Sequence, residues 1–222
     1  MNRKSNNTNL KTHPDEGLVA IDQPKFTVVM ADPPWDVNQK GSRGAAGHYD
    51  LMTLEQIKAM PVAELINDNA VCFLWITSGV KGRHAGEEVM KAWGFDYKDD
   101  LIWIKFRIGQ GVFPRHSHET VLVGYKGKLP PECKNQTSWF VAPVQEHSHK
   151  PEEIYAIIER AFPSDKYLEL FARKRTSHKD WYIWGNEAEG NSDVYIPGYP
   201  VPKYSDKVHL AKEDDLKEEA KP

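Results

Sequence analysis

The chain has 222 residues, of which 40% are hydrophobic and 27% are charged, and its formal net charge is −3. This composition indicates one globular domain with a sizeable core, and it excludes a disordered chain and a uniformly basic nucleic-acid coat protein. Cys72 and Cys133 form no metal-binding or disulfide spacing, so we expect a reducing, cytoplasmic location. We also expect no membrane partner, because no uninterrupted apolar run approaches the length of a membrane span.

The two ends of the chain differ in composition from its middle. Residues 1–17 are rich in Asn and Lys, and residues 203–222 are dense in Lys, Glu and Asp. Such segments offer little apolar surface to bury. We therefore predict a disordered lead-in over residues 1–17, one folded domain over residues 18–202 and a charged tail over residues 203–222.

Strand-like apolar runs alternate with helix signals inside this predicted domain. A capping box of Thr53 and Gln56 opens a first helix, which Pro61 ends or interrupts. A second helix is predicted over roughly residues 84–93 with Gly94 as its stop, and a third runs from Pro151 to near residue 163. The predicted strands cover residues 26–31, 70–76, 101–104, 120–124, 167–171 and 181–184. This alternation predicts an α/β sandwich, in which a mostly parallel central sheet has helices on both faces and binds ligands beyond the carboxyl ends of its strands.

The motif Asp32-Pro33-Pro34-Trp35 directly follows the first of these strands. The Asp32 carboxylate and the Pro33 carbonyl can accept both hydrogens of an exocyclic amine, which makes its nitrogen a better nucleophile. Two prolines fix φ and leave two carbonyls without competing backbone donors. Trp35 offers a face on which a base can stack, worth roughly 1–3 kcal/mol. These features suit methylation of an exocyclic amine such as N6 of adenine, with extrusion of the base if the substrate is a duplex.

The alternative to a catalytic motif is a purely structural Pro-rich turn that caps a strand. The preceding strand, the following aromatic residue and the α/β context all disfavour it.

The segment from Val29 to Asp36 resembles the signature of the MT-A70 family of S-adenosylmethionine-dependent adenine-N6 methyltransferases. This family includes the catalytic subunit of the messenger-RNA methyladenosine writer. The likeness runs from about Phe26 to Gly190. Each further match is weak alone, but their order and spacing are specific. These matches lie at residues 73–77, 101–105, 118–124, 148–155, 168–173 and 184–186.

The resemblance implies roles for individual residues. Asp32, Pro33, Pro34 and Trp35 form the catalytic loop, with Asp32 also beside the cofactor S-adenosyl-L-methionine. Lys150 reaches the carboxylate end of that cofactor or the catalytic Asp32. The residues implied to lie beside the ribose, its hydroxyls or the adenine of the cofactor are Phe171, Arg173, Asn186 and Glu187. The residues implied to line the target-base pocket are Tyr49, Lys105, Glu119 and His149, and the Gly-rich segment 36–50 matches a gate over the site.

The chain also departs from the family pattern. Lys174-Arg175-Thr176 replaces a Pro-His-Asn that helps to hold the ribose, and Glu187 replaces a Gln. The adenine-binding loop that should precede the first strand cannot be aligned, although Ile21 and Asp22 are candidates.

The order of the motifs predicts a permuted Rossmann-like methyltransferase sandwich, with the catalytic motif early and the cofactor-binding region late. A short form of this kind looks like the bacterial and phage copies, so we expect DNA rather than RNA as the nucleic-acid partner. A homodimer is consistent with the negative net charge, because pairing could complete a binding groove.

Three alternatives stay open. A non-catalytic, nucleic-acid-binding subunit with a methyltransferase fold would bind no cofactor, and a cytosine-N4 methyltransferase would share the acidic proline turn. His116-Ser-His118 and His147-Ser-His149 could make a four-histidine metal site. Methyl transfer from a sulfonium needs no metal, so we predict none and assign these histidines to nucleic-acid or supporting contacts.

Overall fold

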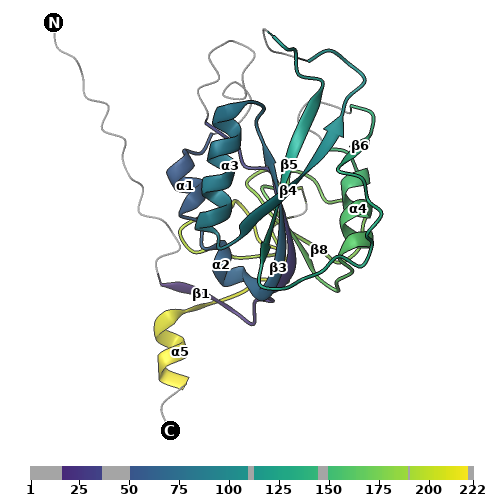
Figure 1. The fold of residues 1–222 in the computed structure, drawn as a ribbon. Helices are drawn as coiled ribbons and strands as arrows, with labels where there is room; N and C mark the ends of the chain where they lie inside the picture. The colour runs from purple at the N-terminus through teal and green to yellow at the C-terminus, as the bar shows by residue number, and fades with distance from the viewer. Residues whose placement is uncertain (1–16, 37–50, 110–112, 145–149, 190, 220–222) are drawn as a thin grey trace, which may run out of the picture.

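The computed structural model describes residues 17–36, 51–109, 113–144, 150–189 and 191–219. Its centre is a seven-stranded sheet in the order β6-β4-β5-β3-β2-β7-β8 (Figure 1). Within the described residues only β5 runs antiparallel to its neighbours, and the other strands share one direction. The strands are β2 (Phe26–Ala31), β3 (Ile66–Ile76), β4 (Asp96–Ile104), β5 (His118–Lys126), β6 (Trp139–Val141), β7 (Tyr167–Leu170) and β8 (Trp181–Trp184).

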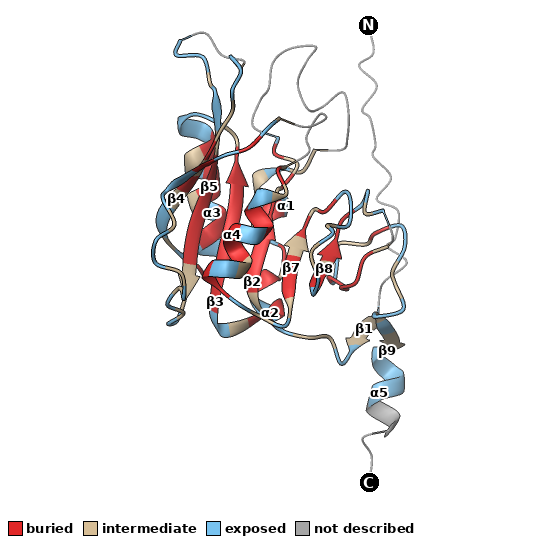
Figure 2. Ribbon diagram, turned by 90° about the vertical axis from the view of Figure 1, so that its right-hand side faces the viewer, coloured by how far each residue is buried: buried red, intermediate tan, exposed pale blue. Residues whose placement is uncertain are grey.

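Helices cover both faces of this sheet, as Figure 1 shows. One face packs against α1 (Leu54–Lys58), α2 (Val62–Leu65) and α3 (Val80–Ala92), and we call the core between them the α3-side core. The other face packs against α4 (Glu153–Ala161), across the α4-side core. The central strands are buried on both faces (Figure 2). The predicted α/β sandwich with a mostly parallel sheet is therefore confirmed.

Each predicted strand is present, and β2 and β8 have the predicted bounds, but β3, β4 and β5 extend beyond their apolar runs. β3 begins at Ile66 rather than residue 70, and β4 begins at Asp96 rather than residue 101. The polar extension of β4 is paired with β5, and that of β3 begins where Ile66 pairs with Phe26 of β2; ladder hydrogen bonds do not require apolar side chains. β7 ends one residue early, since Phe171 takes the left-handed conformation at φ 65°.

The predicted helix boundaries are confirmed at their capped ends. Thr53 and Gln56 form the reciprocal capping box of α1, and Gly94 ends α3 at φ 85°. α3 begins four residues before the predicted start, directly after Gly79. Its first turn lies close to the sheet at Gly82, where a Cβ atom would stand 1.9 Å from the Thr77 carbonyl oxygen.

The sequence did not predict a small second sheet, in which β1 (Leu18–Ile21) pairs antiparallel with β9 (His209–Lys212) ahead of α5 (Glu213–Glu219). The segment between β8 and β9 is tied to the domain by Asp193, which is 2% exposed. Its carboxylate accepts hydrogen bonds from Arg175 and Ser205 and lies 3.6 Å from the Lys207 ammonium. Contacts with the domain thus continue past residue 202, at least to Ser205 and Lys207. The division into a domain and a charged tail at that residue stays a prediction. None of the helices in the described ranges is long and apolar enough to span a membrane.

Candidate active site

Several predicted site residues meet at one edge of the main sheet. Asp32 follows β2, and its backbone N–H donates to the Leu170 carbonyl at the end of β7. Lys105 follows β4 at the same edge. Because β5 is antiparallel, its second residue, Glu119, lies at that edge as well. Side chains alternate along strands, and this alternation directs Asp32 and Glu119 to the α4 side of the sheet.

These side chains form a chain of alternating charges. The Lys150 ammonium lies 2.6 Å from an Asp32 carboxylate oxygen and 3.4 Å from a Glu119 carboxylate oxygen. Lys105 forms an ion pair with the other oxygen of Glu119. Two tryptophans form the floor, since Lys150 lies 5.1 Å from the ring centroid of Trp75 and Lys105 lies 4.4 Å from that of Trp103. The structure thus unites three segments that are far apart in the sequence.

Burial and ion pairing shift the pKa values of these side chains in opposite directions. Burial raises the pKa of Asp32, although the Lys150 charge opposes it. Burial also acts to raise the pKa of Glu119, but Lys150 and Lys105 outweigh it and lower that pKa. For Lys150, burial lowers the pKa of the ammonium, and the two carboxylates more than reverse this effect. A charged lysine therefore holds the two acids together at neutral pH.

The Asp32–Trp35 turn differs in two respects from the sequence interpretation. The Pro33 carbonyl accepts the Trp35 N–H at 2.9 Å, and the Pro34 carbonyl accepts the Met52 N–H at 2.9 Å. The expectation that both carbonyls lack backbone donors is therefore wrong, because the chain folds back on itself through Met52. A carbonyl oxygen has two lone pairs, so Pro33 keeps the capacity for one further hydrogen bond.

The stacking role predicted for Trp35 is also wrong in this structure. Its side chain is 6% exposed within the α3-side core, and its indole N–H donates to the Trp75 carbonyl at 3.0 Å. A buried ring of this kind anchors the turn to β3 and offers no free face to a base.

The second group of predicted residues lies at the ends of β7 and β8. The Phe171 ring packs edge-on against Trp184, with centroids 5.4 Å apart. Arg173 and Glu187 form an ion pair with Nε and Oε2 2.7 Å apart, beside the exposed Asn186. Tyr49, His149 and all of the predicted gate (residues 36–50) except Asp36 lie outside the described residues.

The half-buried Glu169 and the buried Tyr155 at this site received no role from the sequence. Glu169 lies on β7 beside β2, where the Tyr155 hydroxyl donates to its carboxyl at 2.9 Å. Burial, with a smaller contribution from the nearby Asp32 charge, raises the pKa of Glu169 to about 8. The sequence signal was available, because a single acid interrupts the apolar run of residues 167–171.

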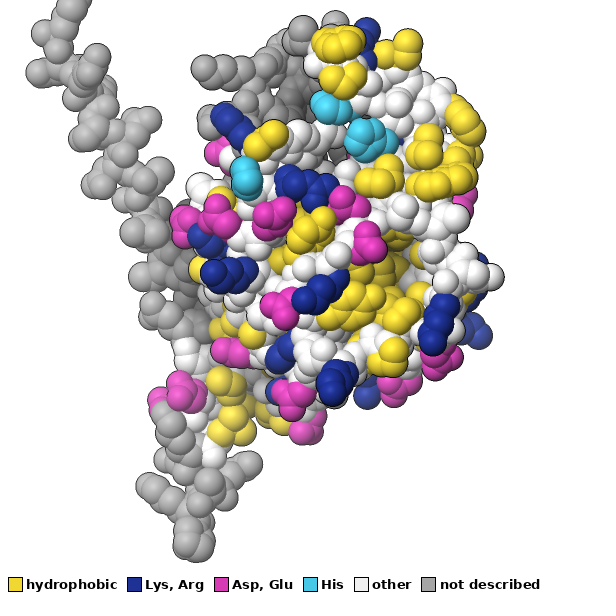
Figure 3. Space-filling view, in the orientation of Figure 1, with side chains coloured by type: hydrophobic (Ala, Val, Ile, Leu, Met, Phe, Trp, Pro, Cys, Tyr) yellow, Lys and Arg dark blue, Asp and Glu magenta, His cyan; other side chains and the backbone are white. Residues whose placement is uncertain are grey.

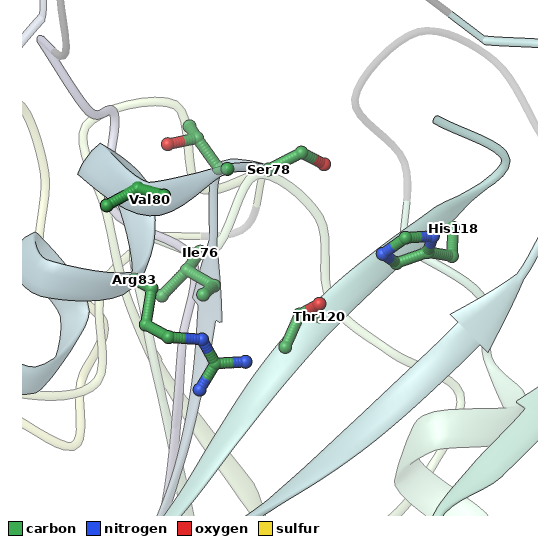
Figure 4. A pocket seen from close by; sticks show the side chains of 8 residues that line it. Ile76, Ser78, Val80, Arg83, His118 and Thr120 are labelled. Atoms are coloured by element: carbon green, nitrogen blue, oxygen red, sulfur yellow. The ribbon is translucent and has the colours of Figure 1, made fainter. Parts of the chain in front are cut away.

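A cavity of about 280 Å³ opens at the same end of the sheet, between β3, α3 and β5 (Figure 4). Its lining residues are Ile76, Thr77, Ser78, Gly79, Val80, Arg83, His118 and Thr120. Ile76 belongs to the α3-side core, so this cavity and the Asp32 cluster lie on opposite faces of the sheet. Arg83 is already bound to Asp100 at 2.6 Å. We therefore place the chemistry at the charged cluster and not in this cavity.

Within the described ranges, no group of three or more His, Cys, Asp or Glu side chains is arranged to hold a metal ion. The rings of His116 and His118 lie edge-on with centroids 6.0 Å apart. His147 and His149 fall outside the described residues, so the four-histidine alternative stays untested.

The sheet, its two helix layers and the acidic turn after β2 define a Rossmann-like methyltransferase sandwich. The chain belongs to the MT-A70 family, whose model matches residues 26–187. It is 36% identical over 173 residues to the Arabidopsis thaliana protein named N(6)-adenosine-methyltransferase MT-A70-like, which covers 74% of this chain and 24% of that protein. It is 34% identical over 177 residues to the human N(6)-adenosine-methyltransferase catalytic subunit METTL3, which covers 75% of this chain and 29% of that protein. The chain thus spans about a quarter of the length of these relatives.

A relative of similar length also matches. The type II methyltransferase M.MunI of Mycoplasma sp. is 28% identical over 214 residues, which covers 85% of this chain and 89% of that protein.

Proposed function

We propose that the protein transfers a methyl group from S-adenosyl-L-methionine to the N6 amine of adenine, with DNA as its substrate. The observation that carries this proposal is the Asp32–Lys150 pair at the carboxyl end of β2. Membership of a family whose relatives are named N(6)-adenosine-methyltransferases supports the reaction. Likeness over 89% of a type II methyltransferase favours DNA over RNA.

The residues at the ends of β7 and β8 fit this cofactor. Asn186 and Glu187 are exposed at the end of β8 and offer oxygen acceptors suited to ribose hydroxyls. The indole N–H of Trp184, at the end of β8, is buried without a hydrogen-bond partner in the described part of the chain. Phe171 and Arg173 would flank the cofactor, and Lys150 would pair with its carboxylate. The cofactor supplies a methyl group on a cationic sulfur.

The chain's own residues would act on the amine. The Asp32 carboxylate accepts one amine hydrogen, and the remaining lone pair of the Pro33 carbonyl accepts the other, which localises the nitrogen lone pair for attack. The Lys150 charge favours the ionised form of Asp32, which is the form that can accept. Glu119 and Lys105 present paired charges on the side where the target base would enter. Alignment of the amine with the donor methyl would supply much of the rate.

A radiolabelled methyl-transfer assay tests this function. We would offer unmethylated duplex DNA, single-stranded DNA and RNA of one sequence, digest each product to nucleosides and identify the methylated nucleoside by mass spectrometry. We expect N6-methyladenine, with most of the label in DNA. Asp32→Ala should keep the wild-type circular dichroism spectrum and lose roughly a hundredfold or more in rate. Methylation by Asp32→Ala at the wild-type rate would refute the assigned chemistry.

The same assay separates the alternatives. N4-methylcytosine in the digest would identify a cytosine methyltransferase. No transfer, together with no heat of cofactor binding by calorimetry, would identify a non-catalytic subunit. Gel filtration with light scattering tests the predicted homodimer, and the cytoplasmic location also remains a proposal.

A further inference from the structure

The connection between β4 and β5 exposes three large apolar side chains. Phe106 is 86% exposed, Ile108 is 75% exposed and Phe113 is 93% exposed. Single exposed apolar residues are ordinary, but a group on one projecting connection marks an interaction site. Figure 3 shows hydrophobic side chains at the upper end of the molecule, beside basic side chains and histidines.

The two described limbs of this connection are hydrogen-bonded to each other. The Arg115 guanidinium donates two hydrogen bonds to the Gly109 carbonyl, at 3.0 and 2.7 Å. At the base of the connection, the Lys105 N–H donates to the Ser117 carbonyl at 2.8 Å. These hydrogen bonds bring the limb that carries Phe106 and Ile108 next to the limb that carries Phe113.

The base of the connection is part of the candidate active site. Lys105 and Glu119 flank it on β4 and β5, and Glu119 contacts Lys150, which holds Asp32. Phe106 is the next residue after Lys105, so the apolar group begins one residue from the charged cluster. A molecule bound against Lys105 and Glu119 would therefore lie near these side chains.

Charge indicates the kind of molecule. The exposed Arg107 and Arg115 alternate along the chain with Phe106, Ile108 and Phe113, although the protein as a whole carries a net charge of −3. Local arginines bind phosphates independently of base sequence. Apolar side chains between such arginines can enter a base step and unstack it.

We propose that Phe106, Ile108 and Phe113 form a wedge that enters duplex DNA beside the target adenine, while Arg107 and Arg115 bind the flanking phosphates. The wedge fills the space left by the extruded base and so lowers the cost of extrusion, which a single strand does not incur. This proposal rests on the proposed function, and it adds a reason why this enzyme can act on a duplex.

The double variant Phe106→Ala/Phe113→Ala tests the wedge, with Leu216→Ala as a matched control. Leu216 is 37% exposed on α5, at the opposite end of the molecule in Figure 1. We would compare kcat/KM on a duplex and on its isolated adenine strand. The double variant should lose roughly ten- to a hundredfold more on the duplex than on the single strand, as expected from the loss of stacking contacts. Leu216→Ala should leave the ratio unchanged.

A second readout does not depend on methylation. A duplex with 2-aminopurine at the target position brightens when that base leaves the stack, so wild-type protein should raise its fluorescence and the double variant should not. If the wild type methylates no substrate, the proposed function has failed, and this fluorescence alone decides the wedge.

Two outcomes would overturn the wedge. Equal losses on duplex and single strand, with normal 2-aminopurine brightening, would show that the aromatic side chains play no part in extrusion. A wild-type dimer that becomes a monomer in the double variant, by light scattering, would show that these side chains bind a second copy of the chain.

Discussion

Substitution of Glu169 by glutamine tests whether this half-buried acid, which lies near Asp32, is protonated in the folded protein. Burial raises the pKa of Glu169 to about 8, helped by the charges of Asp32 and Glu152 and opposed by the Tyr155 hydroxyl. The folded state therefore holds a proton that the unfolded state releases. The resulting stability is complete below the unfolded pKa of 4.5 and is lost as pH rises through about 8.

The magnitude follows from these two values. With a pKa of 4.5 unfolded and about 8 folded, linkage gives a loss of about 4 kcal/mol between pH 5 and pH 9. The Glu169 side chain is partly exposed, so solvent reduces this loss, and we expect about 1–4 kcal/mol. A glutamine side chain does not titrate, so the Glu169→Gln variant should not show this loss. Its stability relative to the wild type should therefore rise by that amount between pH 5 and pH 9. Each kcal/mol moves the melting temperature of a domain of this size by about 2–4 °C.

Urea and thermal denaturation at pH 5, 7 and 9, followed by circular dichroism without cofactor, would measure this difference. Tyr155→Phe provides the control, because it removes a hydrogen bond that lowers the Glu169 pKa and should enlarge the loss at high pH. The double variant Tyr155→Phe/Glu169→Gln should show no such loss. A difference between wild type and Glu169→Gln that stays constant from pH 5 to pH 9 would show that the folded protein holds no proton at Glu169.

Three further substitutions have expected outcomes. Lys150→Met should reduce methyl transfer roughly a hundredfold or more, because Asp32 loses its counter-ion. The variant should keep the wild-type circular dichroism spectrum. Methyl transfer at the wild-type rate would contradict the role of the ion pair. Asp193→Asn should cost about 1–3 kcal/mol in urea denaturation at pH 7, since it removes a buried carboxylate that accepts hydrogen bonds from the partly exposed Arg175. The pKa of Asp193 is lowered, so this stability should vanish as pH falls through that pKa, and a deficit independent of pH would contradict it. Gly82→Ala should cost about 1–3 kcal/mol because α3 must move off the Thr77 carbonyl; unchanged melting would show that the helix shifts freely.

Some residues of the charged cluster and its surroundings could be predicted from the sequence, and others could not. The Asp32 turn and Lys150 were identified through a family pattern, and each stands directly before or after a recognisable strand or helix. Glu169 and Tyr155 lay within matched segments. Their separation in the sequence nevertheless does not predict that a residue of the helix contacts a residue of the strand that follows it. Their contact exists only because α4 packs across β7.

The sequence by itself determined the local structure and the chemistry of the key turn. Apolar runs of strand length, the Thr53 capping box and Gly94 specify strands and helix ends through interactions between near neighbours. The residues of the Asp32–Trp35 motif limit the chemistry because carboxylate and proline have few conformational choices.

Only the tertiary structure decided which distant groups meet. The antiparallel direction of β5 carries Glu119 to the edge where β2 ends, which a list of strands does not specify. The burial of Trp35 and the use of the proline carbonyls by Trp35 and Met52 depend on how the chain returns to this turn just before α1. The pairing of β1 with β9 joins short strands from opposite ends of the chain. Such long-range pairings depend on the summed burial of the whole domain, which no local pattern records.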